Sequence, residues 1–154
     1  MTGATGLLGS WVAPELGRRG AERLVRDGAP RSILARDGWL DRIVTVRGSL
    51  SDDGLLRRAF AEYGIETAFH LGAQTLVGVA KVDPVGTLEA NVRGTWLLLE
   101  AARQAGVKQV LVASSDKAYG DSANLPYFED HPLQGRFPYD VSKSCTDLVT
   151  TMYA

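Results

Sequence analysis

The glycine-rich stretch Thr2-Gly3-Ala4-Thr5-Gly6-Leu7-Leu8-Gly9 decides the expected fold. Its glycines recur every third residue and allow a tight turn with a close approach of the backbone to a ligand. A helix is expected from about residue 7 to residue 19, kinked by Pro14, and its free N–H groups suit a pyrophosphate. A glycine-rich turn without a ligand is the alternative, because only two residues precede Gly3 and leave no room for the strand that should lead into such a turn.

Predicted strands alternate with predicted helices after this turn. The strands are 23–26, 43–46, 67–71 and 109–113, the last being a near-continuous apolar run typical of a buried parallel strand. The helices are 30–40, 52–63, 84–105 and 139–154, with Ser51 or Asp52 as the cap of the second and Gly106 at the end of the third. This alternation predicts an α/β domain with about four parallel strands and right-handed crossovers.

Length and composition indicate one ordinary globular domain over residues 1–154. The chain is 45% hydrophobic and 23% charged, and its net charge of −1 gives no electrostatic argument for binding nucleic acid or an anionic membrane. No apolar run approaches membrane-spanning length and the N-terminus has no signal pattern. Cys145 is the only cysteine, which fits a reducing compartment. We therefore expect a cytoplasmic protein without nucleic-acid or membrane partners.

Tyr139 and Lys143 form a candidate catalytic pair. They follow Pro138, a residue that suits a first helical turn, and residues four apart on a helix share a face. An ammonium group beside a phenol favours the phenolate and lowers the pKa of the tyrosine, so Tyr139 is a candidate general base near neutral pH. A solvated helix face is the alternative, because tyrosine and lysine fall four apart in many proteins.

Further candidates stand just after predicted strands, where ligands bind in parallel sheets. Ser115, Asp116 and Lys117 follow strand 109–113, with a polar turn as the alternative. Small residues at 72 and 73 follow strand 67–71 and let a cofactor lie on the backbone. His70, inside that strand, is expected to be a packed core histidine and not a catalyst.

Arg26 and Asp27 end strand 23–26 roughly where a dinucleotide fold places its ribose-reading residue. An aspartate accepts a hydrogen bond from the ribose 2′-OH and favours NAD, whereas Arg26 suits the 2′-phosphate of NADP. NAD is the preferred cofactor, NADP stays open, and a solvated surface pair is the alternative. Asn91 interrupts the apolar pattern of helix 84–105 and is either buried for a reason or exposed.

Five motifs in this order resemble the extended short-chain dehydrogenase/reductase superfamily, specifically its NAD-dependent nucleotide-sugar epimerases and dehydratases. They are residues 2–9, His70-Leu71-Gly72-Ala73-Gln74, Asn91-Val92-Arg93-Gly94-Thr95, Ser114-Ser115-Asp116-Lys117-Ala118-Tyr119-Gly120 and Tyr139-x-x-x-Lys143. The Ser-Asp-Lys run, together with Asp130-His131-Pro132-Leu133-Gln134-Gly135, is most similar to CDP-glucose 4,6-dehydratases.

The resemblance implies a Rossmann-like parallel sheet with flanking helices, incomplete because the first strand and the C-terminal substrate lobe are missing. It implies a homodimer through the helices starting near Pro84 and Pro138, and no metal. Ser49 stands where the family has an aspartate that contacts adenine. The implied cofactor contacts, beyond Arg26 and Asp27, are Gly3, Thr5, Gly6, Leu7, Leu8, Gly9, Ser49, Leu50, Leu71, Gly72, Ala73, Asn91, Tyr139 and Lys143.

The resemblance also implies a reaction on a nucleotide-sugar, carried by Ser115, Asp116, Lys117, Tyr139 and Lys143. Tyr139 would take the proton of the sugar 4-OH as hydride passes from C4 to NAD, and Ser115 would bind the same oxygen. Asp116 would protonate the departing 6-OH of a 4,6-dehydratase. Lys117 holds the position of a base and would need to be neutral to act as one.

Two other functions stay open. A 4-epimerase needs only the tyrosine, lysine and serine, and the acid at Asp116 is the reason to prefer a dehydratase. The second is a truncated fragment that binds nucleotide or dimerises without catalysis.

Overall fold

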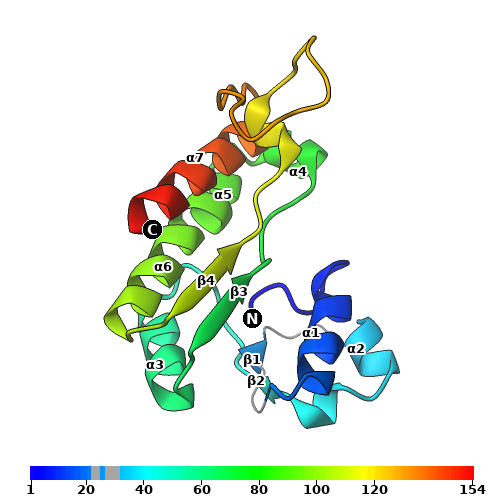
Figure 1. The fold of residues 1–154 in the computed structure, drawn as a ribbon, viewed down its shortest axis with the longest axis vertical. Helices are drawn as coiled ribbons and strands as arrows, with labels where there is room; N and C mark the ends of the chain where they lie inside the picture. The colour runs from blue at the N-terminus through cyan, green and yellow to red at the C-terminus, as the bar shows by residue number, and fades with distance from the viewer. Residues whose placement is uncertain (22–24, 27–31) are drawn as a thin grey trace.

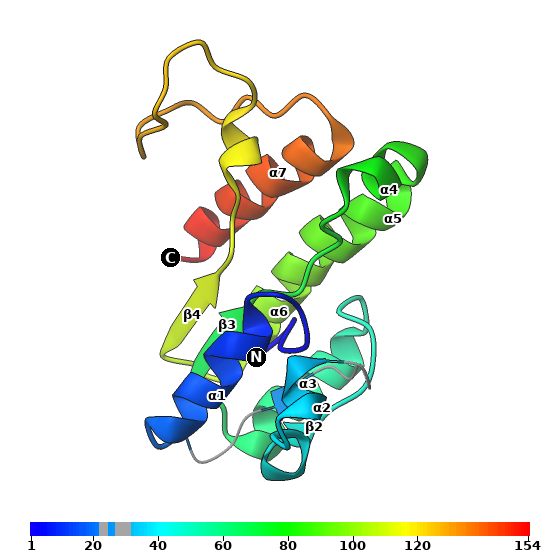
Figure 2. The same cartoon turned by 90° about the vertical axis from the view of Figure 1, so that its right-hand side faces the viewer.

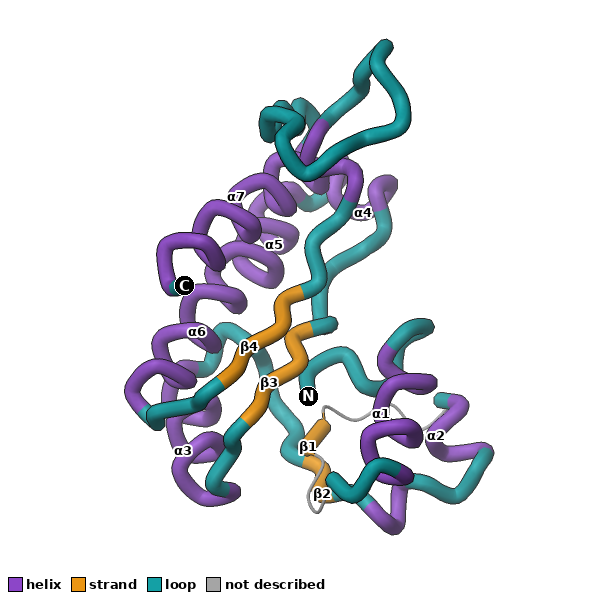
Figure 3. The backbone as a smooth tube through the Cα atoms, in the orientation of Figure 1, coloured by secondary structure: helices purple, strands orange, loops and turns teal. Residues whose placement is uncertain are grey.

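The protein is an α/β domain with four short parallel strands, seen in a computed structural model that describes residues 1–21, 25–26 and 32–154. Strand β1 (Val25–Arg26) pairs with β2 (Val44–Thr45), and β3 (Thr67–His70) pairs with β4 (Gln109–Val112), both in parallel. The two pairs stand apart in Figure 3, where the strands are orange. The predicted Rossmann-like α/β class is confirmed.

The N-terminus lies between the two strand pairs (Figure 1) and adds one paired residue to the sheet. The N–H of Thr2 donates to the carbonyl of Phe69 at 2.9 Å, and the N–H of Leu71 donates to the carbonyl of Thr2 at 3.3 Å. This is a parallel bridge between Thr2 and His70. Ahead of Gly3, the described residues contribute this one bridge to the sheet.

Helices cover the strands from two sides. The helices are α1 (Gly9–Arg18), α2 (Ile33–Arg36), α3 (Asp53–Tyr63), α4 (Val77–Val82), α5 (Pro84–Leu88), α6 (Gly94–Gln104) and α7 (Pro138–Tyr153), with short turns η1 (Leu40–Arg42), η2 (Glu89–Arg93) and η3 (Asp116–Tyr119). Helices α3, α5, α6 and α7 lie on one side of β3 and β4, while α1 and α2 lie on the other (Figure 1). The loop between η3 and α7 extends beyond the N-terminal end of α7 (Figure 2).

Most helix ends follow from the sequence. Asp52 caps α3 by accepting the Leu55 N–H at 3.0 Å, and Gly106, with φ of +70°, follows α6. Helix α1 begins two residues later than predicted and runs through Pro14. In place of the helix predicted over 30–40, the described residues form α2, of four residues, and the turn η1. Helix α4 was not predicted.

Two apolar clusters hold the layers together. The larger one joins α3, β3 and α6 through Leu56, Phe60, Ala68, Leu98, Ala101 and Ala102. The smaller one joins Ala4, Ala13 and Leu34 on the side of α1 and α2. The prediction that strand 109–113 is buried is wrong, because Leu111 keeps 49% of its surface exposed. Among the described strands β4 pairs only with β3, and alternate residues face away from the larger cluster.

Candidate active site

Three segments meet at the carboxyl end of the strands, as expected for a parallel sheet. They are the turn after Thr2, the segment 71–74 after β3 and the segment 114–117 after β4. The first two are joined directly, because the N–H of Gly72 donates to the hydroxyl of Thr2 at 3.0 Å. The first half of α7 is joined to the residue just before the third segment, because the Lys143 ammonium donates to the carbonyl of Ala113 at 2.9 Å.

The glycine turn depends on close backbone packing. Gly3 has φ of +66°, and a Cβ there would lie 2.6 Å from the backbone N of Gly72. A Cβ on Gly9 would overlap the carbonyl of Gly3. Within the described residues, no backbone partner binds the N–H groups of Leu7, Leu8 and Gly9 at the start of α1. This cradle of free N–H groups at a helix N-terminus fits the pyrophosphate of a dinucleotide.

His70 is buried and neutral, as the sequence predicts for a core histidine. Its Nδ1 lies 2.6 Å from the Thr2 hydroxyl, and its Nε2 lies 3.0 Å from the Thr95 hydroxyl. The Thr95 hydroxyl donates its one proton to the Asn91 carbonyl, so it accepts a proton from Nε2 of His70. Nδ1 then accepts the proton of the Thr2 hydroxyl. Burial, with the charges of Lys143 and the N-terminus, lowers the pKa of His70 from 6.5 to about 4.

Asn91 is buried and joins the segment after β3 to helix α7. Its side-chain oxygen accepts the Gln74 N–H at 2.7 Å, and its amide nitrogen donates to the Gln74 carbonyl at 3.0 Å and to the Ser142 hydroxyl at 2.9 Å. Its carbonyl accepts the hydroxyls of Thr95 and Thr146. Both N–H protons of the Asn91 amide are therefore bound by protein groups, and its contact with the cofactor stays a prediction.

Tyr139 and Lys143 both lie in the first half of α7 and both are buried. Burial lowers the pKa of Lys143, whose ammonium is held by the Ala113 carbonyl. The Tyr139 hydroxyl makes no hydrogen bond to any described residue. The Ser142 hydroxyl, between them in sequence, donates to the Tyr139 carbonyl at 2.6 Å and so stiffens this turn.

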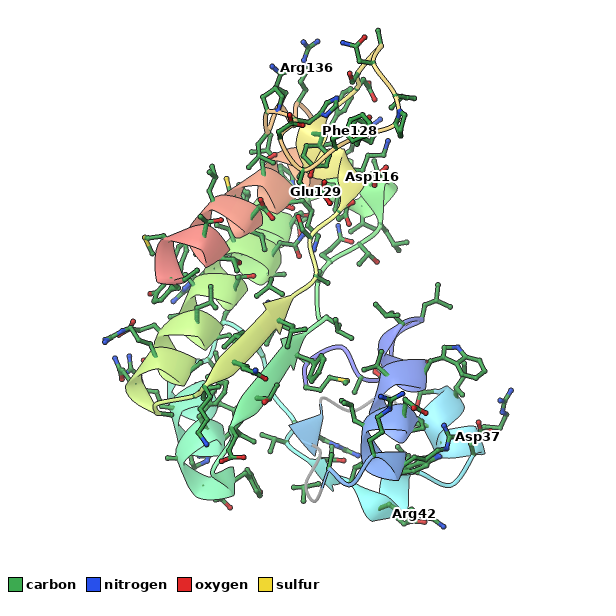
Figure 4. The ribbon with its side chains drawn as sticks, viewed as in Figure 1. Asp37, Arg42, Asp116, Phe128, Glu129 and Arg136 are labelled. Atoms are coloured by element: carbon green, nitrogen blue, oxygen red, sulfur yellow. The ribbon has the colours of Figure 1, made fainter. Side chains whose placement is uncertain are left out.

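Ser115, Asp116 and Lys117 are more open to solvent than the tyrosine and lysine. The Ser115 hydroxyl donates to the Asp116 carboxylate at 3.2 Å and accepts the Lys117 N–H at 3.2 Å, which caps η3. The side chains of Asp116 and Lys117 are exposed. Figure 4 shows Asp116 at the same end of the molecule as Phe128, Glu129 and Arg136.

The loop between η3 and α7 is anchored next to these residues. Tyr119 stacks on Tyr127 with ring centroids 5.3 Å apart, and His131 packs edge-on against both rings. The Tyr127 hydroxyl donates to the Gly120 carbonyl at 2.7 Å, and the Ser144 hydroxyl on α7 donates to the Ala118 carbonyl at 2.8 Å. These contacts fix η3 against the start of α7, where the predicted catalytic side chains stand.

Some of the remaining predicted cofactor contacts lie at the carboxyl end of the strands, and others lie elsewhere. Thr5 and Gly6 lie in the glycine turn and Ala73 lies in the segment after β3, so all three lie at the carboxyl end of the strands. Ser49 is exposed, and its hydroxyl accepts the Ser51 N–H. Leu50 points into the interior beside the larger cluster. The backbone of Arg26 lies in β1, and Asp27 lies outside the described residues. The choice between NAD and NADP therefore stays a prediction.

The comparisons with known proteins agree with this geometry. The family model described as "NAD dependent epimerase/dehydratase family" matches residues 1–154. The chain belongs to the NAD-dependent epimerase/dehydratase family. Curated members of the epimerase/dehydratase family include the CDP-glucose 4,6-dehydratase of Salmonella typhimurium, 35% identical over 99% of this chain, and the UDP-glucose 4-epimerase of Neisseria meningitidis serogroup A, 32% identical over 98%.

Solved structures of the epimerase/dehydratase family share the fold. The dTDP-glucose 4,6-dehydratase of Streptomyces venezuelae, solved with NAD bound, is 30% identical with a TM-score of 0.88, and covers 99% of this chain. The UDP-glucose 4-epimerase of Thermus thermophilus, solved with NAD, is 31% identical with a TM-score of 0.86 over the same share. The chain spans about half of the length of these proteins: 44% and 46% of the two curated relatives, and 50% and 49% of the two structures.

Several side chains that shape this edge were not predicted from the sequence. Thr2, Thr95, Gln74 and Ser142 form the hydrogen bonds that join the glycine turn, the segment after β3 and α7. The sequence contained a signal for Thr95, which lies four residues after Asn91 on one helical face.

None of the helices in the described ranges has the length and apolar content to cross a bilayer.

Proposed function

We propose that this chain is the cofactor-binding and catalytic half of a nucleotide-sugar 4,6-dehydratase that uses NAD. The observation that carries the proposal is the Asp116 carboxylate beside the Ser115 hydroxyl, on the turn that the Tyr119 and Ser144 contacts hold against the start of α7. Support for the cofactor comes from the glycine turn with its free N–H groups, and from the NAD-bound family structures.

Each residue then has one task. Tyr139, with Lys143 beside it, takes the proton from the sugar 4-OH, and Ser115 donates a hydrogen bond to the same oxygen. NAD, held at the glycine turn, would supply the acceptor that takes up the C4 hydride and the donor that gives it to C6. The 4-ketone acidifies the C5 proton; a base removes it while Asp116 gives its proton to the departing 6-OH, so that water leaves. The base then returns its proton to C5 as the hydride reaches C6. Lys117 is our candidate for the base. It would have to be neutral when it acts.

Epimerisation at C4 is the second candidate function, and the UDP-glucose 4-epimerases at 30–32% identity favour it. It needs the proton transfer at Tyr139 and the hydrogen bond from Ser115, followed by return of the hydride to the other face of C4. No acid is required at position 116. The two reactions therefore differ in product from the same glucose nucleotide: a 4-keto-6-deoxy sugar with loss of water, or the 4-epimer at unchanged mass.

The first test is calorimetric titration of the 154-residue chain with NAD and then with NADP. Saturable binding with NAD preferred supports a working cofactor site, whereas preference for NADP would assign the ribose contact to Arg26 instead of Asp27. Absence of binding in a folded sample would leave only a non-catalytic fragment. Incubation with NAD and CDP-glucose or UDP-glucose, with mass analysis of products, then separates dehydratase from epimerase.

The Asp116→Asn variant tests the acid. Hydride transfer from C4 should proceed near the wild-type rate in a single turnover, and loss of water should slow by roughly 10² or more, the usual contribution of a general acid. Nicotinamide absorbance follows the first step and product mass follows the second. Equal slowing of both steps would remove Asp116 from the acid role.

We also propose that two chains associate through α5, α6 and α7. Large apolar side chains on these helices stay exposed in the single chain: Val85, Leu88, Trp96, Leu148 and Met152. Apolar surface gathered on one helical layer is typical of a protein interface. The partner in this proposal is a second copy of the chain.

A further inference from the structure

His131 closes a turn in the loop between η3 and α7 with two hydrogen bonds to Phe128. Its backbone N–H donates to the Phe128 carbonyl at 3.1 Å, and its ring Nδ1 accepts the Phe128 N–H at 3.1 Å. A backbone N–H can only donate, so Nδ1 carries no proton and the ring is neutral in this structure. The Asp130 carboxylate lies 4.0 Å from the same nitrogen, beyond hydrogen-bond distance.

Three aromatic rings surround the His131 ring, and one of them belongs to η3. Tyr119, the last residue of η3, and Tyr127 stand edge-on to it, with ring centroids 6.0 and 5.7 Å away. Phe128 stacks on it at 6.0 Å. The His131 side chain therefore keeps only 19% of its surface exposed, although it lies in a surface loop. The turn and the end of η3 pack together through this ring.

The same loop binds the backbone of η3 three residues further along. The N–H of Gln134 donates to the Ala118 carbonyl at 3.1 Å, and a Cβ on Gly120 would overlap the Gln134 carbonyl. The loop and η3 are thus in close backbone contact. Asp116 is the first residue of η3, a turn of four residues. A rearrangement of the turn 128–131 is therefore expected to reach the segment that carries this carboxylate.

We propose that His131 is a proton-controlled latch that positions η3. When neutral, its ring accepts the Phe128 N–H and keeps the turn 128–131 closed against Tyr119. When protonated, both ring nitrogens donate, so the Phe128 N–H loses its acceptor and Nδ1 turns to the Asp130 carboxylate. The turn then opens and its contacts with η3 loosen. The switch is a local change of charge that biases an element with two arrangements.

Few groups face the His131 ring, so its own protonation is expected to control the turn. Histidine ordinarily changes charge between pH 5 and 8, whereas phenols and carboxylates ordinarily do not. The titratable groups around the ring are the Tyr119 and Tyr127 phenols and the Asp130 carboxylate. The other charged side chains of the turn and of η3 form no hydrogen bond or ion pair with the ring in the described part of the chain: Glu129, Asp116 and Lys117.

This inference does not rest on the proposed catalytic function, and its test omits NAD and nucleotide-sugar. The test is an NMR titration of the 154-residue chain from pH 8 to pH 5. The chain has two histidines, and burial lowers the pKa of His70 to about 4, so the two ring signals can be told apart. We expect the amide signals of Phe128 and Gln134 to shift with the same midpoint as the His131 ring. Protection of the Gln134 amide from hydrogen exchange should fall at least threefold on the acid side.

The His131→Gln variant carries a side chain that does not titrate, so neither amide should show this transition. An equal transition in His131→Gln would assign the effect to another group and overturn the proposal. So would a Gln134 amide that ignores the ring titration in the unaltered chain, because the ring would then not act on η3. A His131 ring that stays neutral down to pH 5 would overturn it as well.

A matched pair of carboxylate variants tests the exchange of partners at Nδ1. Asp130→Asn removes the ion pair of the protonated ring, so opening should need more acid. The midpoint of the Gln134 shift should fall by roughly 0.2 to 0.7 pH unit, as expected for an exposed ion pair. Asp121→Asn makes the same change at an exposed residue of the same loop that forms no ion pair with the described residues, and it should leave the midpoint unchanged. Equal midpoints in the two variants would refute the latch as proposed.

Discussion

Burial sets the protonation state of His70, and this makes the stability of the fold depend on pH. The pKa of His70 is about 4 in the folded chain and about 6.5 when unfolded. Below pH 6.5 the unfolded chain takes up a proton that the folded chain refuses, so stability falls as pH drops and the loss levels off near pH 4. The full loss is roughly 3 kcal/mol, from 1.36 kcal/mol per pKa unit.

Urea unfolding of the chain at pH 7, 6 and 5 measures this dependence, in a range where ordinary carboxyl groups stay largely ionised. The His70→Gln variant keeps a hydrogen-bonding side chain that does not titrate, and its unfolding free energy should be nearly flat over the same range. An equal slope in both proteins would show that another group carries the effect.

Gly9 gives a second residue-scale prediction. A side chain there would collide with the Gly3 carbonyl, so Gly9→Ala must move the turn that presents the N–H groups of Leu7 and Leu8. We expect NAD affinity to fall at least tenfold in calorimetry. Gly78→Ala is the matched control, because a Cβ at Gly78 in α4 meets open space. Unchanged affinity in Gly9→Ala would remove the turn from the cofactor site.

At the scale of elements, the π-helical turn η2 between α5 and α6 positions Asn91. Such turns widen the helix locally and often mark functional sites. Asn91→Ala would leave the Gln74 backbone groups and the Ser142 hydroxyl without this partner, at a cost of about 1–3 kcal/mol in unfolding free energy. Asn124→Ala, in an exposed loop, should change the unfolding free energy by less than about 0.5 kcal/mol. Equal effects in the two variants would show that the Asn91 contacts contribute nothing.

The same elements show what the sequence could predict. Apolar spacing and Gly106 located the helix between residues 84 and 105, because these signals are local. The spacing did not reveal η2, since one widened turn barely changes a helical pattern. The burial of β4 was predicted wrongly because its apolar run describes composition, while exposure depends on which strands and helices pack against it. The predicted site motifs were local too, and the Thr2–His70–Thr95 bonds were missed because they join residues far apart in sequence.

At the scale of the whole molecule, the chain presents an apolar helical face that we assign to a second copy. Leu148 on α7 is 61% exposed, and Leu125 in the loop before α7 is 66% exposed. Leu148→Lys should place a charge inside the interface and convert a dimer to a monomer in sedimentation equilibrium at micromolar protein, because an unpaired buried charge is costly. Leu125→Lys makes the same chemical change outside α5–α7 and should sediment as the unaltered chain does. A monomeric unaltered chain, or equal behaviour of the two variants, would contradict association through these helices and leave the exposed apolar side chains for a different partner.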